Sequence, residues 1–283
     1  MKLASSRNFK IIFGVVFGLL ALDILSAFVY PGVSHLAKDN PKKSAMMEYR
    51  EAQWAREGKD MKVRQKWVPL SRISPYAMKA VIISEDDKFW SHTGFDVEGM
   101  ESALEKDLKK KQFKAGGSTI SQQLAKNLFL SPSRNPVRKL KEAILTWRLE
   151  RALSKRRIIE IYLNVAEWGP GVFGIEEAAR YHFGTSAAGL SPVQSARLAS
   201  ILPNPIRFSP TNPSKFISRR SNFIYRVLVR RGVVIPEFEE VMHPEEPAPA
   251  ATEAVFGNSS GVSQPTESGP ETRPAFGAAS TSQ

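Results

Sequence analysis

The sequence predicts a mainly α-helical domain behind a single N-terminal membrane helix. The chain has 283 residues, enough for one substantial domain with appendages. Helix-start signals recur along its central part, and apolar residues repeat there at helical spacing. No sustained alternation of polar and apolar residues indicates strands. The first 30 residues contain an apolar run long enough to cross a bilayer.

The apolar run covers residues 11–30 and is interrupted only by Asp23. Lys2, Arg7 and Lys10 precede it, so the positive-inside rule predicts a cytoplasmic N-terminus and an extracytoplasmic domain. A cleaved signal peptide is the alternative, but no clear small-x-small cleavage pattern follows the run. We therefore expect a retained single-pass anchor in the inner (cytoplasmic) membrane, in which Asp23 is energetically costly.

The predicted organisation has five parts. They are a cytoplasmic N-terminus at 1–10, the anchor at 11–30, a membrane-proximal connection at 31–66, the folded domain at 67–243 and a tail at 244–283. The tail is rich in Pro, Ala, Ser, Thr, Gly and Glu and lacks apolar periodicity. It cannot bury enough surface to offset its ordering entropy, so we expect it to be disordered.

The net charge of +12 favours an anionic partner, which would be a nucleic acid, a membrane surface or a phosphorylated substrate. The anchor argues against nucleic acid, because it would place the basic domain outside the cell. The chain has no cysteine, which excludes disulfides and thiolate metal sites, and its four histidines argue against a histidine metal cluster.

Several residue pairs predict where the helices of the domain begin. A capping residue before proline occurs at Ser74-Pro75, Asn135-Pro136, Ser191-Pro192 and Asn212-Pro213. Thr119 and Gln122 form a capping box behind a Gly-Gly turn, and Gly184 and Gly232 are predicted helix stops. In the helix after Asn135, the apolar stripe is expected to comprise Val137, Leu140, Ile144 and Trp147.

The stretch 97–114 combines an apolar stripe with a high density of lysine. Its stripe and its basic residues are Met100, Leu104, Leu108, Phe113, Lys106, Lys109, Lys110, Lys111 and Lys114. A basic amphipathic helix of this kind can lie in a membrane interface. An ordinary surface helix with its stripe in the core is the alternative.

The stretch 84–92 (Ser-Glu-Asp-Asp-Lys-Phe-Trp-Ser-His) places several ionisable groups, Glu85 among them, at the end of an apolar helical segment and is the first candidate for chemistry. A carboxylate in that position is a candidate proton acceptor or donor, although a solvated helix end has the same composition. His92 follows shortly after and is either part of the same site or a structural histidine. Downstream, Gly117 and the hydroxyls of Ser118 and Thr119 precede a helix N-terminus, which suits an anionic group.

Two further polar groups follow. Gln123, Lys126 and Asn127 lie opposite Ile120 and Leu124 on the next helix, where they either line a sugar or phosphate groove or face water. Cationic residues then gather around one carboxylate, forming either a surface ion pair or a cationic pocket that could stabilise a diphosphate leaving group. These residues are Arg134, Arg138, Lys139 and Glu142.

Five segments in order make the sequence resemble the peptidoglycan glycosyltransferase family, found also in the N-terminal half of bifunctional penicillin-binding proteins. The segments are 85–96 (Glu-Asp-x-x-Phe-x-x-His-x-Gly-x-Asp), 116–127, 138–142 (Arg-Lys-x-x-Glu), 155–164 (Lys-x-x-Ile-Ile-Glu-x-Tyr-Leu-Asn) and 197–205. Ser121 and Ile159 replace a usual Thr and Leu, which keeps the hydroxyl and the packing. The segment 164–174 resembles the monofunctional branch, and the chain contains neither Ser-x-x-Lys nor Lys-Thr-Gly. The resemblance therefore implies glycan polymerisation without transpeptidase activity.

The resemblance also implies a lysozyme-like fold with a small membrane-facing subdomain and assigns site residues. Glu85 would be the catalytic base and Glu142 a second essential carboxylate that orients cations or binds metal. The expected substrate is lipid II, attacked in an inverting reaction that releases undecaprenyl diphosphate from the growing glycan strand. The resemblance implies no required cofactor, and a divalent cation, Mg²⁺ or Mn²⁺, held by Glu142 or Glu85 would be an optional helper. The implied substrate-binding residues are Ser118, Thr119, Gln122, Gln123, Lys126, Arg134, Arg138 and Lys139.

Membrane lipids and other cell-wall synthesis proteins are the remaining expected partners. Two alternative functions stay open. A lysozyme-like enzyme that cleaves peptidoglycan would share the architecture, but it needs a general acid and has no use for a cationic cluster. A non-enzymatic membrane-bound scaffold would have no reason to keep both Glu85 and Glu142.

Overall fold

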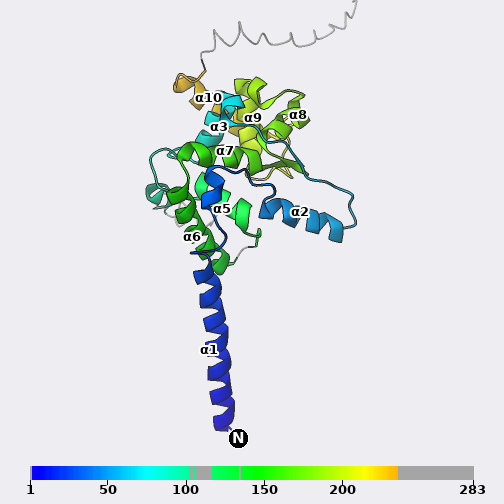
Figure 1. The fold of residues 1–283 in the computed structure, drawn as a ribbon. Helices are drawn as coiled ribbons and strands as arrows, with labels where there is room; N and C mark the ends of the chain where they lie inside the picture. Colours follow the sequence, from blue (N-terminus) through cyan, green and yellow to red (C-terminus); the bar gives the residue numbers. More distant parts are fainter. Residues whose placement is uncertain (1, 102–104, 106–116, 134, 235–283) are drawn as a thin grey trace, which may run out of the picture. The chain divides into compact units, whose positions relative to one another are not determined.

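The computed structural model describes residues 2–101, 105, 117–133 and 135–234. This part of the chain is mainly α-helical with one small sheet, so the predicted fold class is confirmed (Figure 1). Within the predicted interfacial stretch 97–114, residues 97–101 are helical, while most of the remainder lies outside the described residues. The predicted tail, 244–283, lies wholly outside them.

In chain order, the helices of the described residues are α1 (Lys2–Ser26), α2 (Ala45–Arg56), α3 (Pro75–Glu85), α5 (Ile120–Phe129), α6 (Pro136–Ala152), α7 (Lys155–Val165), α8 (Ile175–Phe183), α9 (Pro192–Ile201) and α10 (Lys215–Arg230). Short 3-10 turns occur at Ser34–Ala37, Leu70–Arg72 and Ala187–Gly189. The strands are β1 (Arg64–Gln65), β2 (Glu167–Gly169) and β3 (Val172–Phe173).

Most predicted helix starts are confirmed. Thr119 and Ser191 form capping boxes, and Asn135 accepts a hydrogen bond from the amide of the third residue of α6. Ser74 precedes α3 without a side-chain cap, because its hydroxyl donates to a carbonyl outside the helix instead. The start at Asn212-Pro213 was wrong by two residues: Ser214 caps α10 by accepting from the amide of the third helical residue.

The sheet was not predicted because its strands are too short to show an alternating pattern. β2 and β3 pair antiparallel, and β1 adds to β3 in parallel. Since β1 comes from residues 31–66, this connection contributes directly to the folded unit. Within the same segment, α2 packs against α5, with Met47 and Trp54 buried.

The core lies where α3 packs on α9 and α10, and where α5 packs on α6 and α7. α7 is buried along most of its length, from Ile158 to Val165. This packing holds the end of α3 and the exposed face of α5 in fixed positions, and those two places carry the candidate site.

Asn164 connects α7 to the chain that precedes α3. Its side-chain oxygen accepts from the Val68 amide at 2.9 Å, and its side-chain nitrogen donates to the carbonyls of Val68 at 2.9 Å and Glu160 at 2.8 Å. Gly174 passes so close that an added Cβ would lie 2.8 Å from the Asn164 carbonyl oxygen, at a φ of +80°. Asn164 is therefore a structural residue within its motif.

Replacing Asn164 with alanine should destabilise the fold by about 2–4 kcal/mol, because it leaves the buried amide and carbonyl of Val68 without partners. Chemical denaturation of the variant measures this loss. Asn212→Ala is the matched control, since the Asn212 side chain is exposed and forms no hydrogen bond with the other described residues. Equal midpoints for both variants would contradict the structural role.

α1 contains the one described segment that is long and apolar enough to cross a membrane, Asn8–Ser26. The helix ends at Ser26 and a turn follows, so the helical part of the anchor stops before the predicted boundary at residue 30. Asp23, which the sequence left unexplained, forms an ion pair with Lys141 of α6 at 2.8 Å. Arg148 of α6 donates to the carbonyl oxygens of Ala27 and Val29.

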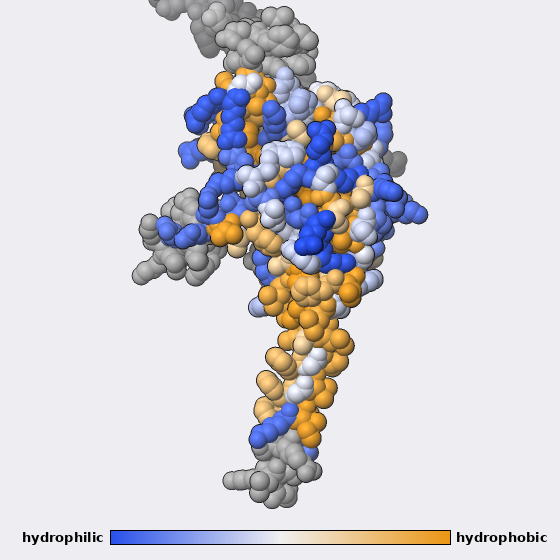
Figure 2. Space-filling model, turned by 60° about the vertical axis from the view of Figure 1, so that its left-hand side comes forward, coloured by the Kyte–Doolittle hydropathy of each residue, from blue (hydrophilic) through white to orange (hydrophobic). Residues whose placement is uncertain are grey.

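The predicted apolar stripe of α6 is not the face that packs into the core. Leu145 and Leu149 are the buried apolar residues of this helix, while Leu140 and Trp147 are each about half exposed. Trp147 contacts Phe28 edge to face, just after α1. Figure 2 shows hydrophobic surface that runs along α1 and onto the adjoining base of the folded part. The exposed apolar side chains of α6 are consistent with this continuous hydrophobic surface.

Candidate active site

Glu85 is the last residue of α3, and three side chains hold its carboxylate. Oε1 accepts from the Ser84 hydroxyl and from Arg220 Nη2 of α10, both at 3.1 Å. Oε2 accepts from Gln123 Nε2 of α5 at 3.0 Å. Residues of α3, α5 and α10 therefore fix the carboxylate. The side chain is still 10% exposed and lines a cavity.

Gln123 is itself fixed by a third helix. The hydroxyl of Tyr162 in α7 donates to Gln123 Oε1 at 3.0 Å. Burial raises the pKa of Tyr162 well above its usual value, and the nearby carboxylates of Glu85 and Asp86 raise it further. Tyr162 therefore stays protonated, and a chain of donors runs from Tyr162 through Gln123 to Glu85.

Lys126 lies one turn further along α5, and within the described part of the chain its ammonium group forms no hydrogen bond or ion pair. Burial lowers the pKa of Lys126, and the neighbouring charges of Arg138 and Lys139 act in the same direction. Glu142 and Glu85 oppose this shift, which places Lys126 within the electrostatic reach of both carboxylates. A half-buried ammonium group that has no partner among the described residues suits an anionic ligand.

Glu142 is buried, with 2% exposure, and contacts two cations of its own helix. Arg138 and Lys139 each pair with one of its oxygens, and Lys139 Nζ also lies 3.4 Å from the Ser118 hydroxyl. The sequence left open a surface ion pair or a cationic pocket around an embedded carboxylate. The burial of Glu142 favours the pocket. Arg134, the remaining member of the predicted cluster, lies outside the described residues.

Thr119 and Gln122 are buried and bond to one another in the capping box of α5. Thr119 also donates to the Gly94 carbonyl at 2.7 Å. Their recorded contacts are thus internal to the fold, and their assignment to substrate binding stays a prediction. Thr119 and the half-buried Ser118 both line a cavity together with Glu85.

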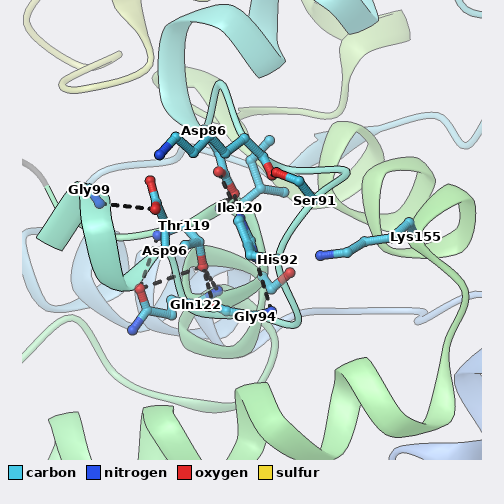
Figure 3. Close-up of polar contacts among 12 residues, drawn as sticks. Asp86, Ser91, His92, Gly94, Asp96, Gly99, Thr119, Ile120, Gln122 and Lys155 are labelled. Atoms are coloured by element: carbon cyan, nitrogen blue, oxygen red, sulfur yellow. Dashed lines mark hydrogen bonds and ion pairs between the residues drawn. The ribbon is translucent and has the colours of Figure 1, made fainter.

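The motif that begins at Glu85 also joins the end of α3 to the start of α5. Buried Asp86 accepts from the Ile120 amide at 2.9 Å and contacts His92 Nε2 at 2.9 Å (Figure 3). The Gly94 amide donates to His92 Nδ1, so Nε2 carries the proton toward Asp86. These contacts favour the structural interpretation of His92.

Two cavities lie at the candidate site, one beside Glu85 and one beside Lys126. The Glu85 cavity, about 170 Å³, is lined by residues 83–87 and 117–119 with Asp96, Gly99 and Met100. The Lys126 cavity, about 210 Å³, is lined by Met46, Arg50, Gln123, Lys126, Asn127, Tyr162, Ala166, Glu167 and residues 202–206. Gln123 lines the second cavity and holds the carboxylate that lines the first, so it connects the two.

The donor set does not fit a dedicated metal site. In the ranges that the structure describes, no three His, Asp or Glu side chains converge as metal ligands. Glu142 faces Arg138 and Lys139, and Glu85 faces Arg220, so each carboxylate already contacts a cation that would repel a divalent ion. We derive no chemical step through a metal.

Sequence reasoning missed four residues of this site. Arg220 is far from Glu85 in the chain, and no local pattern connects them. Arg50 and Glu167 form a bidentate pair at the Lys126 cavity, with both Arg50 Nε and Nη2 at 2.9 Å from carboxylate oxygens. Tyr162 lies within the family-like segment 155–164. Its hydroxyl on an otherwise apolar face of the helix was the one indication in the sequence that it contacts the site.

Comparison with known proteins places the chain in a family. The model of the family described as Transglycosylase matches residues 52–229. A biosynthetic peptidoglycan transglycosylase of Chromobacterium violaceum is 46% identical over 218 residues, which cover 77% of this chain and 96% of the relative. One of Laribacter hongkongensis is 47% identical over 218 residues, covering 74% and 95% respectively. The chain therefore belongs to the transglycosylase family and is a glycosyltransferase of peptidoglycan biosynthesis.

Proposed function

We propose that the chain polymerises lipid II into β-1,4-linked glycan strands and releases undecaprenyl diphosphate. The observation that carries this proposal is that Gln123, which lines the Lys126 cavity, donates to the Glu85 carboxylate, which lines the other cavity. One cavity presents a carboxylate that can accept a proton. The other presents the Lys126 ammonium group, which has no partner among the described residues and can hold a phosphate. A sugar transfer from a diphosphate lipid requires both.

In this proposal the acceptor lipid II occupies the Glu85 cavity and the end of the growing strand occupies the Lys126 cavity. The GlcNAc 4-hydroxyl oxygen attacks C1 of the terminal MurNAc while its proton passes to Glu85. The bond from C1 to the diphosphate oxygen breaks, and its electron pair leaves with undecaprenyl diphosphate. A single displacement at an α-linked carbon gives the β product, so the reaction inverts.

The diphosphate is a weakly basic leaving group, so it needs positive charge more than a proton donor. Lys126, Arg138 and Lys139 supply that charge, and Glu142 positions the last two. Arg220 and Gln123 fix both oxygens of Glu85, which reduces the reorganisation needed before attack. Ser118, Thr119, Gln122 and Arg134 would complete binding of the glycan or diphosphate.

The topology proposed from the sequence fits this chemistry. α1 would cross the inner membrane with its N-terminus in the cytoplasm, and the folded domain would lie at the outer surface, where lipid-linked sugars are presented. The pairing of Asp23 with Lys141 offsets part of the cost of an acidic residue in the anchor. The domain boundary at residue 243 is part of the same proposal, as are membrane lipids and other cell-wall proteins as partners. The predicted start at residue 67 leaves out β1 and α2, which belong to the folded unit.

Incubating the purified full chain with labelled lipid II tests the proposal. We expect glycan chains on a gel that disappear on muramidase digestion, together with released undecaprenyl diphosphate. Lipid II recovered unchanged from a folded sample would reject the proposal. Cleavage of finished cell wall in a parallel reaction would favour the degradative alternative.

A further inference from the structure

A third cavity lies beside the active site, and no step of the proposed reaction uses it. The Tyr181 cleft has a volume of about 420 Å³, within the usual range of small-molecule sites, about 300–1,000 Å³. Its lining residues come from β2–β3, α8 and the chain that follows α9; they are Pro170, Tyr181, His182, Pro205, Ile206, Arg207, Phe208, Ser209 and Thr211.

The Tyr181 cleft continues the Lys126 cavity. Pro205 and Ile206 line both, so a ligand that leaves the Lys126 cavity past these residues enters the cleft. A polymer whose last unit reacts beside Lys126 must send its earlier units along some neighbouring surface. The Tyr181 cleft adjoins the Lys126 cavity and can therefore receive these earlier units.

The chemistry of the lining suits a sugar chain. Tyr181 is 50% exposed and is held on two sides, by Arg64 over its ring at 4.9 Å and by His182 edge to face at 4.8 Å. A fixed, half-exposed ring next to the exposed side chain of Ile206 offers an apolar platform for the C–H face of a sugar.

Polar groups of the right kind surround that platform. The hydroxyls of Ser209 and Thr211 lie 3.1 Å apart and can bond to sugar hydroxyls. Arg207 adds a cation, and none of the residues lining this cleft is acidic. The lining therefore suits a chain of hydroxylated rings that carries carboxylate groups, and it disfavours a cationic ligand.

We infer that the Tyr181 cleft binds the glycan strand beyond its reacting end, with Tyr181 as a stacking platform. This inference rests on the proposed function and extends it. A strand held there stays bound between successive additions, so the cleft governs product length rather than the chemical step. The first coupling of two lipid II molecules does not need it, because no earlier sugars extend that far.

Tyr181→Ala in the full chain tests this inference, with Tyr181→Phe as the variant that keeps the ring. Phe223→Ala is the matched control, since Phe223 is a similarly exposed aromatic residue on α10 that lines none of the three cavities described above. Three readouts are needed: product length on a gel, the rate of the first coupling, and binding of a muramidase-released peptidoglycan tetrasaccharide by NMR titration. Thermal unfolding confirms that each variant is folded.

We expect Tyr181→Ala to shorten the products several-fold and weaken tetrasaccharide binding, with the first coupling within about twofold of the unmodified chain. Tyr181→Phe and Phe223→Ala should keep long products. Unchanged product length and binding in Tyr181→Ala would overturn the inference, and so would a fall in first coupling as large as the fall in length. If the unmodified chain does not use lipid II at all, the proposed function fails. The inference is then still testable: if the unmodified chain binds the tetrasaccharide and Tyr181→Ala does not, the cleft is a glycan site.

Discussion

Glu85→Gln is expected to reduce lipid II polymerisation by about 10²–10⁴-fold, the usual loss when one acid–base group is removed. Glutamine keeps the shape of the side chain and can still accept from Arg220 or Ser84 through its amide oxygen. It cannot accept the proton of the attacking hydroxyl. The initial rate of lipid II consumption measures the loss, and product analysis shows whether any chains form.

Two controls separate the loss of the base from a loss of folding. Glu48→Gln neutralises an exposed carboxylate on α2 and should leave the rate unchanged. The thermal unfolding midpoint of Glu85→Gln should stay close to that of the unmodified chain, because the neighbouring residues remain packed. Activity above about a tenth of the original would mean that another group takes the proton.

The sequence predicted those parts of the molecule that depend on local signals. The caps at Thr119, Asn135 and Ser191 are bonds within one turn, so four residues suffice to specify them. Glu142 and its cations follow from the i, i+3 and i, i+4 spacing of a helix. These features are encoded within a short window and need no knowledge of the tertiary fold.

The parts that were missed depend on contacts between distant segments. Arg220 reaches Glu85 across 135 positions, and Arg50 reaches Glu167 across 117. The apolar stripe of α6 was found, but the sequence alone could not say that it would face outward beside Phe28. A periodic pattern identifies the apolar face of a helix, whereas what covers that face depends on the rest of the fold and on the membrane.

Lys126 is expected to trade stability for catalysis, and Lys126→Met should therefore change the two in opposite directions. Loss of a charge positioned for the leaving group should lower kcat by about 10²–10³-fold, as removal of one electrostatic stabiliser does elsewhere. The same substitution should raise the thermal unfolding midpoint. Methionine keeps the length and apolar character of the stem, and it removes a half-buried ammonium group that has no partner among the described residues.

The sign of the stability change follows from the direction of the pKa shift. Burial lowers the pKa of Lys126 from its usual 10.5, so the folded chain holds this proton less tightly than the unfolded chain does. The cost of the charge is fully present below the folded-state pKa. It disappears as pH rises toward the unfolded value, since stability increases with pH wherever the unfolded state binds more protons. The stabilisation by methionine should therefore be largest near pH 7 and smaller near about pH 10.

Lys215→Met provides the matched control, because Lys215 is exposed at the start of α10 and should affect neither kcat nor the pH dependence of the midpoint. A lower midpoint for Lys126→Met at pH 7 would show that the ammonium group stabilises the fold, which contradicts the direction of its pKa shift. Unchanged turnover of lipid II would instead remove Lys126 from the diphosphate site. A residue that lowers the stability of the free protein but supports turnover is retained for function. This combination is expected of a cation that binds the departing diphosphate.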